Sequence, residues 1–170
     1  MSTSTPGSPI IPAASILLFR SRASSELLVV RRSPSLRFFG GFLAFPGGKT
    51  SPVDADISVQ SVRPVAANLK LVPPLSTRIV AAARELFEET DYHCGELWKL
   101  AQYQPDCDGD WPGCELHIFW TWYDGVQTVT CREGQALQFV KREEACYYPI
   151  PRGLVAAWDL AIAAGAMEKR

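Results

Sequence analysis

Hydrophobic runs alternate with polar segments along the chain, and two of these runs near its start predict the first strands. They cover residues 14–20 and 26–31 and are rich in Leu and β-branched residues, with a polar stretch at 21–25 between them. Short runs of this kind, separated by a polar turn, favour two antiparallel strands. We therefore expect the sheet to begin here.

The second half of the chain predicts further strands and a last helix. Residues 116–123 alternate between two faces, with Phe119 on one and Trp120 on the other, and a shorter run covers 136–140. A stripe of Leu, Trp and Ala side chains at helical spacing predicts a helix over 152–167 that covers the sheet.

A helix is also expected in the middle of the chain, over 77–90. Ile79 and Leu86 fall on one of its faces, and the hydroxyl of Ser76 or Thr77 is suited to cap its first turn. The mixture of strands with flanking helices predicts an α/β sandwich.

The segments between these elements differ in character. Residues 33–52 hold four glycines and three prolines among aromatic side chains, which is too broken for a regular element and too hydrophobic for a solvated linker. We expect an irregular insertion at about 55–75, where prolines recur without periodicity. The Ser, Thr, Pro and Gly of residues 1–12 predict a disordered tail, which leaves 13–170 as one domain.

Composition narrows the class of protein. The chain has 170 residues, of which 47% are hydrophobic and 21% charged, and this size suits a single core. A formal net charge of -1 without any Lys/Arg block argues against a nucleic-acid polymer or a membrane as partner. Five dispersed cysteines without a secretion signal predict reduced thiols and a cytoplasmic protein. The oligomeric state stays open, with a homodimer among the alternatives.

Three glutamates gather on one face of the expected middle helix. Glu85 and Glu89 are one turn apart and Glu88 lies between them in projection, so their charges repel one another near the C-terminal end of the helix. A solvated helix face is one reading. A hard divalent cation is the other, because it would reverse both electrostatic penalties, and Arg84 could hold a carboxylate through a bidentate pair.

The sequence RELFEE at 84–89 resembles the R-E-U-x-E-E core of the Nudix box, and FPGG at 45–48 resembles the turn that opens it. The resemblance implies a Nudix-type α/β/α sandwich with a mixed sheet between helices. It also implies a hydrolase that uses Mg²⁺ or Mn²⁺ to cleave a phosphoanhydride bond with water. By this resemblance Glu85, Glu88 and Glu89 are metal ligands, Glu88 and Glu89 also serve catalysis, and Arg84 orients them.

The chain departs from the family pattern in several places. Asp54 stands where the box has its loop glutamate, and we count it with the metal ligands. Between Asp54 and Arg84 the chain has about twenty more residues than the family pattern, and these would have to loop out. Asp91 replaces the closing glycine, a tolerable change because Asp adopts the left-handed conformation more readily than most residues, and Tyr92 replaces the usual aliphatic.

The attacking water also needs a general base. Glu133, in the turn CREGQ at 131–135, resembles the loop glutamate that several Nudix enzymes use. Glu88 or Glu89 is the alternative base, and an exposed turn glutamate without a catalytic role is the alternative reading of Glu133.

The substrate expectation rests on the segment before the turn. Arg32-Ser33, Arg37 and Gly41 precede FPGG at intervals that resemble the signature of coenzyme A diphosphatases, so coenzyme A or an acyl-CoA is the first candidate. Arg32 and Arg37 would bind its phosphates, together with the Gly47, Gly48 and Lys49 segment. The alternatives are a nucleoside di- or triphosphate or a nucleotide sugar as substrate, with tryptophans as a stacking wall, or a Nudix-fold binding module without catalysis.

Overall fold

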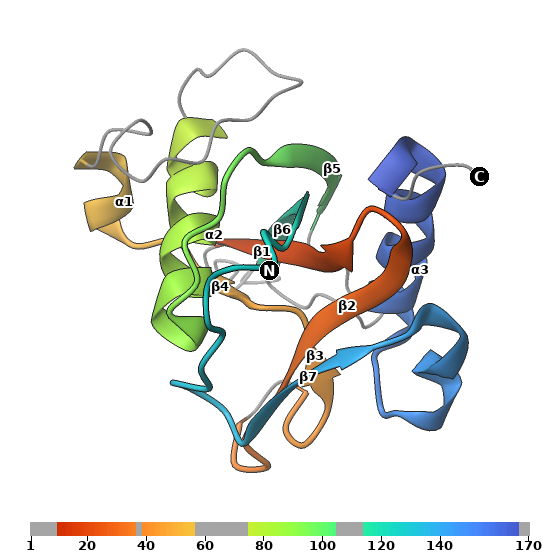
Figure 1. Ribbon diagram of the computed structural model, residues 1–170. Coiled ribbons are helices and arrows are strands. Elements are labelled where there is room, and N and C mark those ends of the chain that lie inside the picture. The colour runs from red at the N-terminus through yellow and green to blue at the C-terminus, as the bar shows by residue number, and fades with distance from the viewer. Residues whose placement is uncertain (1–9, 37–38, 57–74, 105–113, 167–170) are drawn as a thin grey trace, which may run out of the picture.

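The computed structural model describes residues 10–36, 39–56, 75–104 and 114–166, which form one mixed sheet between two layers of helices (Figure 1). The strands are β1 (Ile11–Ser21), β2 (Ser24–Arg31), β3 (Leu43–Ala44), β4 (Gly47–Lys49), β5 (Trp98–Tyr103), β6 (Cys114–Trp122) and β7 (Ala136–Val140). The helices are α1 (Pro52–Asp56), α2 (Leu75–Thr90), α3 (Arg152–Ala161), the 3-10 helix η2 (Arg142–Tyr147) and the π turn η3 (Ile162–Ala166).

The sheet has the order β3-β2-β1-β6-β5, and β4 and β7 pair with β1 and β2. β1 and β6 are parallel, from Ile11 opposite Cys114 to Phe19 opposite Trp122, while the other pairs are antiparallel. The mixed sheet between α2 and α3 confirms the predicted α/β/α sandwich (Figure 1).

Helices cover both faces of β1, so its hydrophobic run continues on alternating sides. Ala14, Ile16 and Leu18 face α2 and belong to one buried cluster. Leu17 and Phe19 belong to a second cluster on the α3 side.

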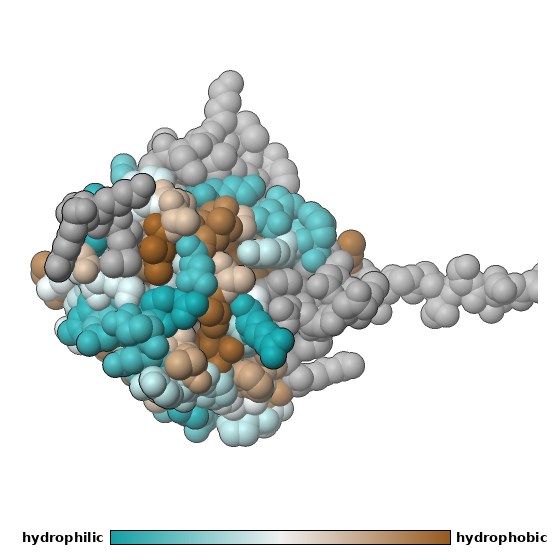
Figure 2. Space-filling model, turned by 90° about the vertical axis from the view of Figure 1, so that its right-hand side faces the viewer, coloured by the Kyte–Doolittle hydropathy of each residue, from teal (hydrophilic) through white to brown (hydrophobic). Residues whose placement is uncertain are grey.

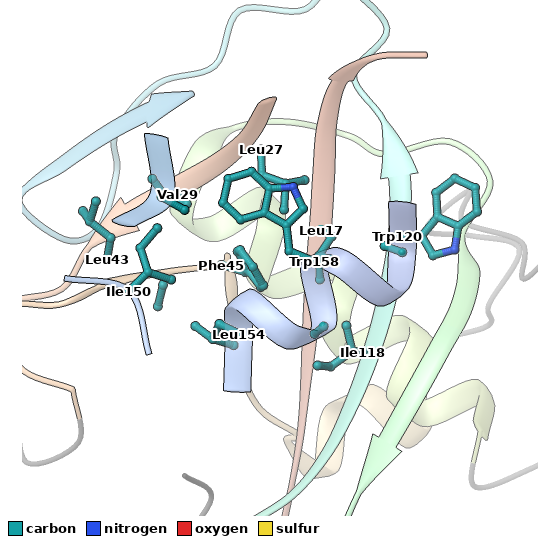
Figure 3. Packing of buried hydrophobic residues seen from close by; sticks show 14 of the residues in the cluster. Leu17, Leu27, Val29, Leu43, Phe45, Ile118, Trp120, Ile150, Leu154 and Trp158 are labelled. Atoms are coloured by element: carbon teal, nitrogen blue, oxygen red, sulfur yellow. The ribbon is translucent and has the colours of Figure 1, made fainter. Parts of the chain in front are cut away.

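The α3 cluster is centred on the fully buried indole of Trp158 (Figure 3). The ring of Phe45 meets that indole edge to face at 6.3 Å, and the indole N–H donates to the Ser25 carbonyl at 3.0 Å. Because Phe45 precedes Pro46 and Gly47, this contact fixes the turn that leads into β4. On the outer surface of this side, hydrophobic residues form only a narrow band between hydrophilic ones (Figure 2).

Several boundaries differ from those expected. β1 begins at Ile11, so Ile11 and Pro12, the end of the expected tail, lie in the sheet. α2 begins at Leu75, which places Ser76 and Thr77 inside the helix rather than at its cap. The last helix was expected to reach 167, but α3 ends at Ala161 and gives way to η3, in which Gly165 has a φ of 102° that no right-handed helix accommodates.

The two broken segments also contain regular structure. The loop at 33–52 includes the short strands β3 and β4, because neighbouring strands satisfy their backbone groups. The last residues of α1 reach into the start of the expected insertion. Residues 57–74 lie outside the described part of the chain, as do residues 1–9 of the tail. In the described residues no helix is long and hydrophobic enough to cross a membrane.

Candidate active site

The site lies where β4 passes the second half of α2. β4 pairs with β1 through Gly47 opposite Ser15, and the buried Ser15 hydroxyl donates to the Pro46 carbonyl at 3.0 Å. These contacts hold the turn against the sheet, so that the two glycines face the glutamates of the helix.

Both glycines are needed because other groups occupy the space of a side chain. A Cβ on Gly48 would lie 2.5 Å from the carboxyl carbon of Glu85. A Cβ on Gly47 would lie 2.4 Å from the carbonyl oxygen of Ala14. The absence of a side chain at Gly48 therefore lets β4 approach the helix, and its absence at Gly47 lets β4 pack closely on β1.

Glu89 is the most buried carboxylate of the group, with 8% of the residue exposed. Burial, reinforced by the neighbouring carboxylates of Glu85 and Glu133, raises the pKa of Glu89 to about 8. Two groups lower the pKa of Glu89: the backbone N–H of Gly47, which donates a hydrogen bond to this carboxylate, and the positive charge of Arg32. Burial also raises the pKa of Glu85, against the lowering effect of Arg84.

Arg84 is anchored by Asp54, which lies in α1. Its Nε donates to Asp54 Oδ1 at 2.7 Å and one terminal nitrogen donates to Oδ2 at 3.1 Å, a bidentate pair. The Asp54 side chain is fully buried, and its Oδ2 also accepts the Ser51 N–H at 2.6 Å. Both carboxylate oxygens of Asp54 are thus engaged within the protein.

The remaining donors of Arg84 reach the glutamates and β4. NH1 lies 2.8 Å from Glu88 Oε2 and 3.0 Å from Glu85 Oε1, and NH2 donates to the Lys49 carbonyl at 3.1 Å. The hydrogen bond to Asp54, together with the negative charges of Glu85 and Glu88, raises the pKa of Arg84 against the opposing effect of burial. The guanidinium therefore joins α1, β4 and α2 at one point.

The donor chemistry of the site fits a hard divalent cation. In the ranges given above, no three His, Cys, Asp or Glu side chains already converge as a metal-binding group. Burial and the charge of Glu85 nevertheless raise the pKa of Glu89, and the Glu88 side chain remains 50% exposed. Carboxylate oxygens of this kind are the ligands that Mg²⁺ and Mn²⁺ prefer, and a bound cation would lower the pKa of each carboxyl group.

By sequence alone, no protein-family model and no curated protein matches the chain. By structure, a NUDIX hydrolase from Alicyclobacillus acidocaldarius is similar with a TM-score of 0.71 at 19% identity, over 92% of this chain and 92% of that one. The chain has the Nudix hydrolase fold. The NUDIX domain of Shewanella oneidensis NrtR, solved with ADP ribose, has a TM-score of 0.65 at 12% identity over 95% and 94% of the two chains. An Ap4A hydrolase from C. elegans is similar with a TM-score of 0.56 at 15% identity, over 92% of this chain and 99% of that one.

Within this Nudix fold, most residues singled out from the sequence come together. The α2 set of Arg84, Glu85, Glu88 and Glu89 faces β4, and Arg32 and Glu133 are close enough for their charges to act on Glu89. Lys49 lies exposed at the end of β4. Arg37 lies outside the described residues.

Two of the tryptophans that were expected to form a stacking wall do not lie at the glutamates. Trp120 is buried in the α3 cluster, and Trp122 stacks under Arg22 at 3.7 Å, so neither tryptophan lies at the glutamates. The two segments that resemble the Nudix box are joined in space, because Asp54 and Arg84 form a hydrogen bond although they are separated by 30 positions.

Sequence reasoning missed some supporting groups. Ser15 and Ser51, which orient the turn and Asp54, gave no signal because isolated serines on strands and loops are common. Asp91 was noticed only as a departure from the box. It has the left-handed φ of 59° expected for the closing position, and its carboxylate also pairs with Arg132 at 2.6 Å.

Proposed function

We propose that the protein is a Mg²⁺- or Mn²⁺-dependent hydrolase that cleaves a phosphoanhydride bond by attack of water. The observation that carries this proposal is the burial of Glu89 beside Glu85 and Glu133, where its pKa rises to about 8. A solvated helix face, the alternative reading, would leave this carboxyl group exposed and near its ordinary pKa. A cation is the simplest compensation for such a cluster.

In this proposal Glu85, Glu88 and Glu89 hold the metal. The metal, when bound, supplies positive charge that polarises the diphosphate and makes water more acidic. Asp54 is better suited to anchoring Arg84 than to ligation, because Arg84 and Ser51 already engage both of its oxygens. Arg84 then keeps Glu85 and Glu88 oriented.

Glu133 is our candidate for the general base. It is exposed, it lies on the loop after β6, and its charge acts on both Glu85 and Glu89. An exposed carboxylate at the edge of the cluster can take a proton from water and release it to solvent. Glu88, the most exposed of the three helix glutamates, is the alternative base.

The substrate we favour is coenzyme A or an acyl-CoA. Its diphosphate would lie against the glutamates, where Arg32 offers positive charge beside Glu89 and Lys49 a second cation at the exposed end of β4. Arg37 completes the expected phosphate-binding set. The ADP ribose bound to the NrtR domain shares with coenzyme A an adenosine linked through a diphosphate, which supports this class of substrate.

The free thiols of Cys94, Cys131 and Cys146 support a cytoplasmic setting.

Product analysis with a substrate panel tests the proposal. The purified chain is incubated with coenzyme A, ADP-ribose, NADH and nucleoside triphosphates, with Mg²⁺, Mn²⁺ or a chelator, and the products are separated by chromatography. We expect 3',5'-ADP and phosphopantetheine from coenzyme A. Turnover of a nucleotide or nucleotide sugar with inert coenzyme A would reject the substrate but keep the reaction. Binding of a panel member without turnover would instead favour a binding module.

A further inference from the structure

The loop between β6 and β7 is fastened to the C-terminal end of α2. The backbone N–H of Thr130 donates to the Thr90 carbonyl, and the N–H of Arg132 donates to the Glu89 carbonyl, both at 2.9 Å. The last carbonyls of a helix have no partner within the helix. The loop satisfies two of them and so runs directly beside the glutamate cluster.

Asp91 adds a side-chain contact to this junction. Its backbone has a φ of 59° and its N–H donates to the Phe87 carbonyl at 2.8 Å, which is the geometry that ends a helix in the left-handed conformation. The Asp91 carboxylate meets Arg132 Nε at 2.6 Å. Glycine would satisfy the backbone equally well but could not form this ion pair.

Glu133 lies between this junction and a second anchor. On its far side, the N–H of Gln135 donates to the Arg31 carbonyl at 2.8 Å. Gly134 has a φ of 80°, and a Cβ there would lie 2.7 Å from the same carbonyl oxygen. Glu133 therefore projects from a short segment that is held to α2 on one side and to β2 on the other.

From this arrangement we infer that Asp91 and Arg132 form a clamp that positions Glu133 over the carboxylates of α2. The inference rests on the proposed function, since it assigns Asp91 and Arg132 as positioning residues for the candidate base. Neither residue is among the proposed metal ligands, and neither is the proposed base. The side chains remain 35% and 59% exposed, so the pair acts by limiting the motion of the loop rather than by stabilising the fold.

Hydrogen exchange tests the clamp without any substrate. In Asp91→Gly the helix end keeps its backbone conformation, and we expect the Thr130 and Arg132 amides to exchange about twofold to fivefold faster, which is the range for loss of an exposed ion pair. Asp91→Asn keeps an oxygen acceptor for Arg132 but removes the charge, so its exchange rates should lie between those of the wild type and Asp91→Gly. Asp159→Ala, which removes the ion pair between Asp159 and Arg142 at 2.6 Å on the α3 side, is the matched control. Unchanged exchange in Asp91→Gly would overturn the clamp.

A double-mutant cycle then tests whether the clamp acts through Glu133. On the substrate that the wild-type chain turns over, Asp91→Gly should lower kcat about twofold to fivefold with little change in KM. In a Glu133→Gln background the same substitution should have no further effect. An equal loss in both backgrounds would overturn the inference while the wild-type activity keeps the proposed function. No metal-dependent turnover by the wild type would instead remove the proposed function on which the inference depends.

Discussion

Substitution of Glu89 by Gln should stabilise the metal-free protein while it removes catalysis. The carboxyl group of Glu89 ionises near pH 4.5 in the unfolded chain and near 8 in the folded one. Between these values the folded state binds more protons than the unfolded state, so stability falls as the pH rises through this window. Each pKa unit corresponds to about 1.4 kcal/mol, so ionisation of Glu89 lowers the free energy of unfolding by up to about 4 kcal/mol at pH 8.

The assay is thermal unfolding in a chelator between pH 5 and pH 8. The wild type should lose stability across this range relative to Glu89→Gln, by a Tm difference on the order of 10 °C at pH 8. Added Mg²⁺ should raise the Tm of the wild type and leave that of Glu89→Gln unchanged. Glu96→Gln, at an exposed position beyond α2, is the control. If the Tm of the wild type and the Tm of Glu89→Gln change with pH in the same way in chelator, the reasoning is refuted.

Two further predictions concern the groups around the glutamates. Gly48→Ala places a methyl group 2.5 Å from the Glu85 carboxyl carbon, so we expect a folded protein whose kcat/KM falls about 10- to 100-fold, whereas Gly95→Ala, with no atom within 4 Å, should be neutral. Asp54→Asn should lower the free energy of unfolding by about 2–3 kcal/mol in chelator, because Arg84 loses its buried counterion. Urea unfolding without metal measures this loss, and a loss seen only with metal would instead make Asp54 a ligand.

The periodic elements of the fold were predictable from sequence. The interior of β1, the interior of β6 and most of α2 have strong hydrophobic patterns, and β7 has the predicted bounds of 136–140. The strand β5 was missed, since it lies at the edge of the sheet and its half-buried residues show no alternation. The short β3 and β4 depend on pairing with neighbouring strands, which local sequence does not specify.

The glutamate cluster was predictable because three carboxylates at helical spacing are visible in the sequence. Its depth of burial was not, since the exclusion of water from Glu89 depends on β4 and on the loop after β6. The pairing of Asp54 with Arg84 was hidden by the insertion between them. The contact between Asp91 and Arg132 joins positions 41 apart and has no local signature.

The central claim is that these glutamates form a metal-dependent site for attack of water on a diphosphate, and isotope labelling tests it most directly. The reaction is run in ¹⁸O-labelled water with Mg²⁺, and the phosphate-bearing products are analysed by mass spectrometry, with Glu88→Gln and Glu89→Gln alongside. Our account predicts that one labelled oxygen enters a phosphoryl group of one product, only when metal is present, and that Glu89→Gln abolishes this incorporation. Turnover that needs neither metal nor the glutamates, or no turnover of any diphosphate in the panel, would contradict it.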